Sequence, residues 1–365
     1  MSAKALGQSG VEKAVGLLRE LYASYGFTHY KMSKFEEYDL YVKNKDFLVS
    51  DNVITFTDTD GKLMALKPDV TLSIIKNGSY DAGVEKLFYN ETVYRVSKGT
   101  KSFKEFMQVG LECLGDIDEY QITEVLYLAV KSLSTVSKEY LLDISHLGVV
   151  KGVLEDFNLS IDAQKKIISY LGDKNAQGVE NVCESENLSD EQKKILLAIV
   201  NVYGAPDFAI DSLKKAGLDG QALSALNQLE SIVNGLKAFG VCDKVRVDFS
   251  VVNDMGYYNG IVFKGFISGI PTGILSGGGY DKLMQKMGKK ARAIGFAVYL
   301  DELEKYLLEE NEFDVDVAIE YGDEDAKTVG ALVKEIASSG QTVGAFKVVP
   351  KKLRYKKLID LKEGC

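Results

Sequence analysis

The chain has 365 residues, of which 46% are apolar and 27% charged, a composition typical of a folded protein with two or three domains. No run of about 18 apolar residues occurs, which excludes a membrane-spanning helix, and the N-terminal sequence lacks the apolar core of a signal peptide. The net charge of −9 argues against nucleic-acid binding, and four scattered cysteines with two histidines argue against a metal site. We therefore expect a cytoplasmic protein with reduced cysteines and without a cofactor.

Capping residues mark the first predicted helix. Ser9 and Glu12 form a capping-box pattern before apolar residues at helical spacing, and Gly26 ends the helix. Residues 53–66 then alternate around Asp60-Gly61, which predicts a β-hairpin.

Pro68 and Asp69 follow the hairpin and suit the start of a short helix over residues 70–77. Asp69 and Thr71 therefore have two interpretations, a plain helix cap or a polar site at a strand-to-helix junction. Arg95, in an apolar strand before a loop, is open in the same way. It can bind a carboxylate or phosphate bidentately, or it can form a structural ion pair.

The stretch Phe103–Gly115, FKEFMQVGLECLG, is predicted to be a strand. One face carries apolar side chains and the other carries Gln108, Gly110 and Glu112, because side chains alternate along a strand. A buried Gln and Glu are costly without partners, so the second face lines a cavity or meets water at a sheet edge. In the first case Gly110 would leave room for a bound molecule.

The rest of the chain gives a helical middle between strand-rich parts. Helices are expected over 119–137, in several windows of 150–240, and over 294–309; strands are expected over 244–252, 257–267 and 271–277. Residues 314–321, 325–340 and 341–346 indicate a short β-α-β appendix. The predicted fold class is α+β with a mainly antiparallel sheet flanked by helices, a helical insert and a small C-terminal α/β appendix.

Three further features have structural interpretations. The Gly-rich GGGYDKL (277–283) lacks the lysine of a phosphate-binding loop, which favours a tight turn into a helix. His146 is expected to be packed or on the surface rather than catalytic. Residues 341–365 hold seven Lys or Arg against Asp360 and Glu363, and we expect a solvated, frayed end.

The order of these segments resembles the histidyl-tRNA synthetase family, with its class II synthetase fold. The similar stretches are FTDTDGKLMALKPDVT (56–71), VYRVSKGTKSFKEFMQVGLECLG (93–115), MGYYNGIVFKGF (255–266), GGGYDKLMQKMG (277–288) and AIGFAVYLDEL (293–303). The likeness covers about residues 5–310. It implies a class II synthetase-like domain over 1–148 and 241–310, a helical insertion over 149–240, and a truncated C-terminal α/β domain over 311–365.

The resemblance also implies a pocket for L-histidine. Asp69 and Thr71 would meet its amino group with help from Gln108, and Arg95 would face its carboxylate or the adjacent phosphate position. Glu112 with Tyr257 or Tyr258 would hold the imidazole. The implied ligand-binding set is Asp69, Val70, Thr71, Arg95, Gln108, Glu112, Tyr257 and Tyr258.

Several family residues are replaced. Asn253 and Glu302 stand where the family has cations that handle ATP, and Tyr299 replaces a glycine there. Loss of one preorganised donor costs about 3 kcal/mol, so adenylate formation should fall by orders of magnitude. Lys67 also replaces an Arg, and Ser33 replaces a Pro of the dimer interface. No catalytic residue is therefore predicted.

A pocket that keeps amino-acid contacts and loses those of ATP is similar to one branch of the family, the regulatory subunits of ATP phosphoribosyltransferase. LDISHLGVV (142–150) resembles the Asp-x-x-His-x-Gly stretch of that branch. The resemblance implies a non-catalytic subunit that takes part in histidine feedback and joins a short-form catalytic subunit, as a homodimer within a hetero-oligomer. The alternatives are an active histidyl-tRNA synthetase and a synthetase paralogue with another partner or amino acid.

Overall fold

The computed structural model of the protein describes residues 10–48, 52–78, 83–96, 101–251, 257–307 and 313–362. The chain divides into two compact units. One is Ala14–Leu303, and the other combines residues 1–13 with 304–365. Ser9 and residues 252–256, which include Asn253, lie outside the described residues.

Within the described part of the larger unit, nine strands form one sheet. Their order is β1 (Thr28–His29), β5 (Val84–Val96), β6 (Phe103–Gly115), β12 (Arg292–Tyr299), β11 (Leu275–Gly279), β10 (Asn259–Ile267), β7 (Tyr140–His146), β9 (Val245–Asp248) and β8 (Tyr203–Gly204). All neighbours are antiparallel except the pairs β1–β5 and β7–β9. The predicted mainly antiparallel α+β fold is confirmed.

Strand β12 corrects one prediction. Residues 292–299 were expected to lie largely in a helix over 294–309, yet they form a strand between β6 and β11, and only Leu300–Leu307 form a helix, α12. A short apolar run cannot be assigned by periodicity alone, because a central strand is buried on both faces. Gly295 allows β12 to approach β6 closely, since a Cβ there would lie 2.5 Å from the Leu111 carbonyl oxygen.

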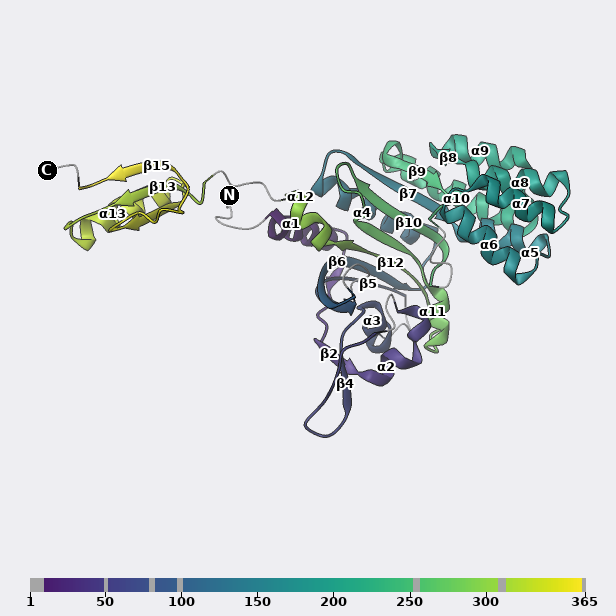
Figure 1. The fold of residues 1–365 in the computed structure, drawn as a ribbon, viewed down its shortest axis with the longest axis horizontal. Helices are drawn as coiled ribbons and strands as arrows, with labels where there is room; N and C mark the ends of the chain where they lie inside the picture. The colour runs from purple at the N-terminus through teal and green to yellow at the C-terminus, as the bar shows by residue number, and fades with distance from the viewer. Residues whose placement is uncertain are drawn as a thin grey trace. The chain divides into compact units, whose positions relative to one another are not determined.

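Several shorter elements lie on one side of this sheet (Figure 1). They are α2 (Tyr38–Lys43), the 3-10 turn η1 (Lys45–Phe47), α3 (Thr71–Asn77) and α11 (Asp281–Lys286). The predicted hairpin is confirmed: β3 (Thr55–Thr57) pairs with β4 (Leu63–Leu66), and β2 (Phe35–Glu37) completes this small sheet. Helices α1 (Gly10–Ser24) and α4 (Glu119–Val136) confirm two predicted helices.

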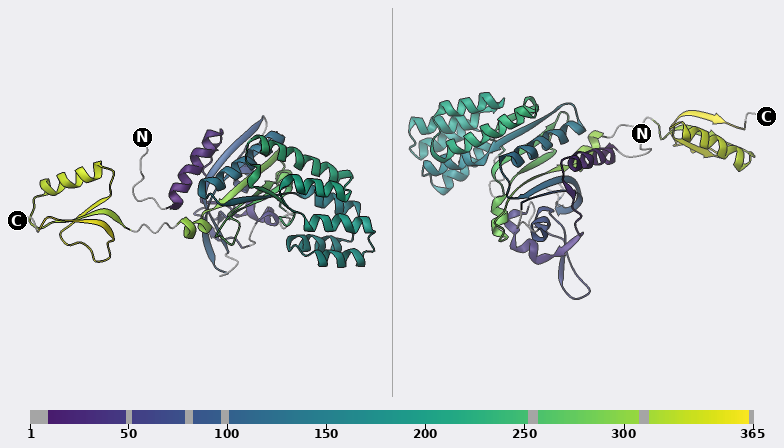
Figure 2. Two further views of the ribbon diagram at one scale, coloured as in Figure 1. Left: turned by 90° about the horizontal axis from the view of Figure 1, so that it is seen from above. Right: turned by 180° about the vertical axis from the view of Figure 1, so that it is seen from behind.

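The predicted helical middle is present as six helices among the described residues. They are α5 (Leu147–Asp156), α6 (Ile161–Gly172), α7 (Ala176–Ser185), α8 (Asp190–Asn201), α9 (Pro206–Ala216) and α10 (Gly220–Ala238), and the 3-10 turn η2 (Cys242–Lys244) follows. Ser189 and Gln192 form a capping box at the start of α8. All six lie together beyond one end of the sheet (Figures 1 and 2). The domain boundaries at residues 148, 240 and 310 stay predictions.

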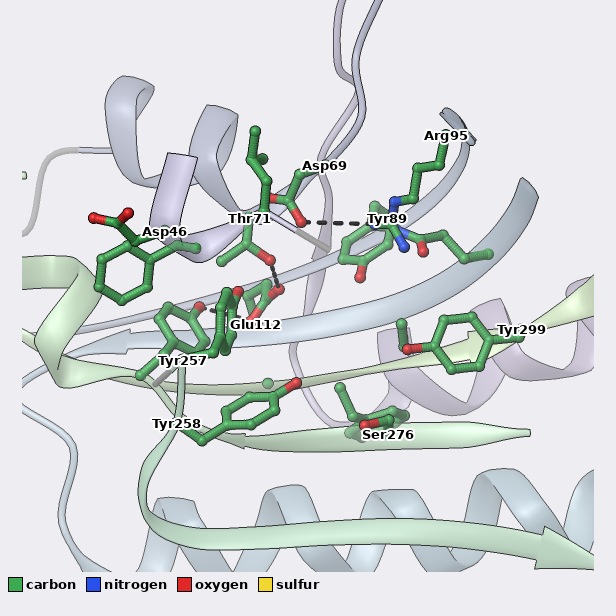
Figure 3. Close-up of a pocket in the computed structure, with 17 residues that line it drawn as sticks. Asp46, Asp69, Thr71, Tyr89, Arg95, Glu112, Tyr257, Tyr258, Ser276 and Tyr299 are labelled. Atoms are coloured by element: carbon green, nitrogen blue, oxygen red, sulfur yellow. Dashed lines mark hydrogen bonds and ion pairs between the residues drawn. The ribbon is translucent and has the colours of Figure 1, made fainter. Parts of the chain in front are cut away.

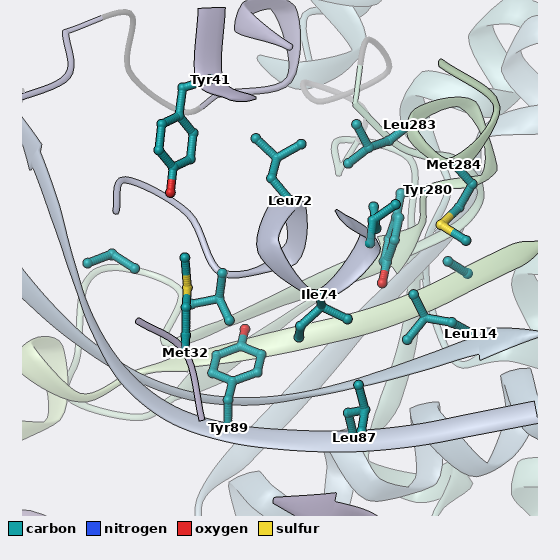
Figure 4. Packing of buried hydrophobic residues seen from close by; sticks show 14 of the residues in the cluster. Met32, Tyr41, Leu72, Ile74, Leu87, Tyr89, Leu114, Tyr280, Leu283 and Met284 are labelled. Carbon is teal, nitrogen blue, oxygen red and sulfur yellow. The ribbon is translucent and has the colours of Figure 1, made fainter. Parts of the chain in front are cut away.

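A compact apolar cluster supports the pocket side of the sheet (Figure 4). Leu72 and Ile74 of α3 are fully buried over β5 and β6. Leu283 and Met284 of α11 belong to the same cluster. The cluster fixes α3 and α11, the two short helices next to the candidate site.

The smaller unit contains a parallel sheet, in the order β14 (Val343–Phe346), β13 (Val315–Glu320), β15 (Tyr355–Asp360), with helix α13 (Ala326–Ser338). The predicted β-α-β appendix is confirmed. The prediction of a frayed basic end was wrong for Tyr355–Asp360, since β15 pairs with β13 along its length. Its lysines hid a strand pattern because β15 is an edge strand, where charge is common. No helix among the described residues is long and apolar enough to span a membrane.

Candidate functional site

A cavity of about 430 Å³ lies against the face of the sheet formed by β6, β11 and β12. Helix α3, the turn η1 and the pair Tyr257–Tyr258 close its other sides. Its described lining residues are Asp46, Phe47, Leu48, Asp69, Thr71, Tyr89, Arg95, Gln108, Glu112, Tyr257, Tyr258, Ser276, Tyr280, Gly295, Phe296, Ala297 and Tyr299. In Figure 3, Asp69 and Thr71 lie on one side, Tyr258 and Ser276 on the other, and Glu112 between them.

The strand β6 places its polar face toward this cavity, as predicted. Gln108 and Glu112 are both 3% exposed and both line it. The role expected for Gly110 was wrong in detail, because the ring of Tyr89 fills the space beside it, where a Cβ would lie 2.4 Å from the Tyr89 hydroxyl. The glycine that makes room at the site is Gly295, whose Cβ would lie 1.7 Å from Glu112 Oε2.

Glu112 is the buried carboxyl group at the centre of the site. Thr71 Oγ1 donates to Glu112 Oε1 at 2.8 Å, and the Tyr280 hydroxyl donates to Oε2 at 2.7 Å. Burial raises the pKa of Glu112 to about 8, although the bonds from Tyr280 and Thr71 lower it. In the ligand-free protein at neutral pH the carboxyl group is therefore mostly protonated.

Asp69 and Arg95 form the second charged part of the site. Asp69 Oδ1 accepts from the Leu72 backbone N–H at 2.9 Å, so Asp69 caps α3 and also lines the cavity. Arg95 Nε donates to the Pro68 carbonyl at 2.5 Å, and Arg95 Nη2 lies 3.8 Å from Asp69 Oδ2. Burial raises the pKa of Asp69 despite the opposing effect of Arg95. Asp69 therefore caps the helix and also lines the cavity, and Arg95 forms a structural ion pair with it. Ligand binding by Arg95 stays a prediction.

Aromatic rings form the wall beside Glu112. Tyr257 and Tyr258 meet edge to face at 4.6 Å between ring centres, and Phe47 packs on Tyr257 at 6.0 Å. Tyr280 lies 6.2 Å from Tyr257. Such a wall suits a flat ring with a polar edge.

Seven of the eight residues expected at the site line the cavity, and Val70 packs into the apolar core instead. The sequence reasoning missed Tyr89, Tyr280, Ser276 and the η1 residues. Tyr280 could have been noticed because it follows the Gly run of β11 directly. Tyr89 becomes evident only from its register opposite Gly110 on β6.

Comparison with known proteins identifies relatives of this chain. The histidyl-tRNA synthetase family matches residues 8–303 of the chain. The chain belongs to this family. A regulatory subunit of ATP phosphoribosyltransferase from Caldanaerobacter subterraneus is 30% identical over 294 residues, covering 78% of this chain and 75% of that protein. One from Acetivibrio thermocellus is 28% identical over 338 residues, covering 89% and 80%.

Solved structures agree on the fold. A Bacillus halodurans protein described as an ATP phosphoribosyltransferase regulatory subunit/histidyl-tRNA synthetase superposes with a TM-score of 0.80 at 24% identity, covering 96% of this chain and 93% of that one. A chain of the ATP phosphoribosyltransferase (HisG:HisZ) complex from Thermotoga maritima gives 0.62 at 20% identity, covering 80% and 97%. Both likenesses confirm the class II synthetase fold.

Within this family fold, the cavity holds little positive charge. Arg95 is the one Lys or Arg among its described lining residues, against the carboxyl groups of Asp46, Asp69 and Glu112. Glu302, in the first turn of α12, accepts a hydrogen bond from Thr272 Oγ1 at 3.0 Å. Lys67 is 2% exposed and forms an ion pair with Glu91. Within the described ranges no group of three or more His, Cys, Asp or Glu side chains is arranged to hold a metal.

Proposed function

We propose that this chain is the non-catalytic regulatory subunit of an ATP phosphoribosyltransferase. It would act with a short-form catalytic subunit in the first step of histidine biosynthesis, in the cytoplasm, and take part in feedback by histidine. The names of the curated relatives support this role, since the chain covers three quarters or more of each of the two described above.

The cavity is proposed to bind L-histidine. The observation that carries this assignment is Glu112, a buried carboxyl held at both oxygens by Thr71 and Tyr280 beside an aromatic wall. An imidazole N–H can bond to a carboxylate there, and charge-assisted bonds of this type are strong. At the other end, Arg95 would bind the ligand carboxylate, while Asp69, Thr71 and Gln108 would receive the ammonium group.

The protonation of Glu112 fits an imidazole ligand. A free imidazole has a pKa of about 6.5, and Glu112 in the empty site has a pKa of about 8. Between these values the carboxyl group can pass its proton to the neutral ring, and an ion pair forms without net proton exchange. Below this window binding must release a proton, and above it binding must take one up. Affinity should therefore be highest between these two pKa values.

The same cavity is proposed to have no adenylating activity. Three carboxyl groups and one guanidinium among the described lining residues provide poor electrostatic stabilisation for a triphosphate. The alternative, an active histidyl-tRNA synthetase, predicts histidine-dependent exchange of pyrophosphate into ATP. We expect none.

A homodimer is proposed as the form in which the chain enters the complex. Phe35, Phe56 and Leu63 of the small sheet are 46%, 36% and 48% exposed, and the rings of Phe35 and Phe56 meet edge to face at 5.5 Å. Neighbouring exposed apolar side chains of this kind are typical of an interaction surface.

The test is reconstitution with a short-form catalytic subunit, assayed with and without histidine. We expect phosphoribosyl transfer to depend on this chain and to respond to histidine, because a ligand that prefers one state of a complex shifts the complex toward it. A paralogue with another partner would leave the catalytic subunit without activity. The variant Glu112→Gln separates the two roles: it should preserve the dependence on this chain and weaken the response to histidine.

A further inference from the structure

A polar joint, formed by Asn259 and Asp281, connects the segments that carry two of the cavity's tyrosines. Asn259 follows Tyr258 at the start of β10, and Asp281 follows Tyr280 at the start of α11. Asn259 Nδ2 donates to Asp281 Oδ2 at 3.1 Å, and the Lys282 backbone N–H donates to Asn259 Oδ1 at 3.2 Å. The segments that carry Tyr258 and Tyr280 are therefore tied to each other, and Tyr280 in turn bonds to Glu112.

Asp281 also fixes the start of β12. Its Oδ1 accepts from the Ala293 backbone N–H at 2.9 Å, and its Oδ2 lies 3.4 Å from Arg292 Nε. The Arg292 guanidinium donates in turn to the Ile117 carbonyl at 3.1 Å. A shift of the backbone at Tyr280 would therefore strain the joint, because the adjacent Asp281 is bound at both oxygens.

On the other side of the joint lies His146, the last residue of β7. Its Nδ1 accepts from the Gly148 backbone N–H at 3.1 Å and so caps α5. The one proton of the neutral ring is then on Nε2, which lies 2.9 Å from Gln228 Oε1 on α10 and donates to it. His146 thereby joins the sheet to both helices.

Helices α5 and α10 are packed in near-backbone contact. A Cβ at Gly148 would lie 2.9 Å from Ala225 Cβ, and a Cβ at Gly152 would lie 2.6 Å from the Ala222 backbone nitrogen. Two glycines one turn apart on α5 thus allow near-backbone contact with α10. A shift at Gln228 would be transmitted to both helices, because packed interiors respond to strain as units.

A second cavity, of about 30 Å³, separates the two polar pairs. Its lining includes Asn259, Gly260, Asp281 and Arg292, together with His146 of β7 and Gln228 of α10. This volume is enough for one water molecule, and the lining offers several polar partners for it. The gap can be bridged by a water that bonds to both pairs.

We propose that Asn259 and Asp281 are positioning residues for Tyr258 and Tyr280, and that they couple the occupancy of the ligand cavity, across this one-water gap, to His146, Gln228 and helices α5 and α10. The proposal rests on the histidine binding proposed above. A ligand that bonds to Glu112 competes with Tyr280 for its carboxyl oxygens, and the joint receives any resulting change in Tyr280. The helices α5 and α10 are then the part of the chain whose dynamics report the ligand.

The experiment combines hydrogen exchange of the full chain with calorimetry of histidine binding. In the wild type, saturating histidine should slow exchange in α5 and α10 by about 2- to 30-fold, the range of such couplings. Gln228→Ala should abolish this response. It should keep the dissociation constant for histidine within about threefold, because hydrogen exchange reports a rarely populated open state of α5 and α10 that contributes little to the binding equilibrium. The matched control Gln221→Ala, an exposed position on α10, should respond as the wild type does.

Asn259→Ala should abolish the response and also weaken histidine binding about tenfold, as loss of a supporting hydrogen bond behind a ligand does at metal sites. The proposal is overturned if histidine binds to the wild type without changing exchange in α10, or if Gln228→Ala keeps the response. If calorimetry shows no histidine binding, the proposed ligand is wrong. The coupling is then tested by hydrogen exchange of the ligand-free chain. In that experiment Asn259→Ala should speed exchange in α10, and unchanged exchange overturns the coupling.

Discussion

The substitution Glu112→Gln is the most informative change at this site. Gln keeps the shape of the side chain, and its amide oxygen can accept from one of the Thr71 and Tyr280 hydroxyls while its N–H donates to the other. It cannot carry the charge that pairs with an imidazolium. A hydrogen bond to a charged group contributes about 1.5–3 kcal/mol, so the dissociation constant for histidine should rise about 10- to 150-fold. Calorimetry at pH 7 measures this change.

The pH dependence of stability tests the same residue without a ligand. Burial raises the pKa of Glu112 from 4.5 to about 8. Its contribution is therefore fully present below pH 4.5 and is lost as the pH rises through 8, up to about 5 kcal/mol for this shift. Urea unfolding of the wild type should show this loss, and Glu112→Gln should show a smaller one, because the amide does not ionise whereas Asp69, whose pKa burial also raises, still does.

The matched control is Glu105→Gln, an exposed position on the same strand. It should keep the wild-type affinity and the wild-type loss of stability between pH 4.5 and 8. An affinity of Glu112→Gln within about twofold of the wild type, or an unchanged pH dependence, would refute the role assigned to this carboxyl.

Three other changes test the rest of the site. Arg95→Ala should weaken histidine binding about 10-fold or more, yet leave the binding of histamine, which lacks a carboxylate, nearly unchanged in calorimetry. An equal loss of affinity for both ligands would show that Arg95 does not bind the ligand carboxylate. Gly295→Ala should abolish histidine binding and lower the free energy of unfolding by about 1–3 kcal/mol, because its Cβ would overlap Glu112 Oε2; a variant that binds normally would contradict the close contact. Phe56→Ser on the small sheet should shift the chain from dimer toward monomer in sedimentation, and an unchanged dimer would place the interface elsewhere.

Much of the fold could be predicted from local pattern. Strand β6 was placed from residue 103 to residue 115, as the structure has it, because Gln108 and Glu112 share a face that alternates with apolar residues. The hairpin around Asp60-Gly61 was predictable because its turn residues specify the backbone. The Ser-x-x-Gln pattern at Ser189–Gln192 marks the start of α8 in the same way.

The errors came from tertiary context. Strand β12 is apolar on both faces because it lies between β6 and β11. Its apolar residues therefore show no spacing that distinguishes a strand from a helix. Strand β15 carries the adjacent lysines Lys356 and Lys357 and depends on its pairing with β13.

At the site, the resemblance supplied the residues and the structure supplied their arrangement. The sequence could indicate that Gln108 and Glu112 face a cavity. It could not show that Tyr89 occupies the space beside Gly110, or that Tyr280 bonds to Glu112 across 168 positions of sequence. Both contacts depend on strand register, which is a property of the whole sheet.

Thermal melting of the chain with a series of ligands tests the central claim most directly. Histidine at about 100 times its dissociation constant should stabilise the fold by about 2.7 kcal/mol, while other amino acids and ATP with magnesium should leave the melting temperature unchanged. Stabilisation by ATP, or an equal response to several amino acids, would contradict a histidine-specific pocket without nucleotide chemistry.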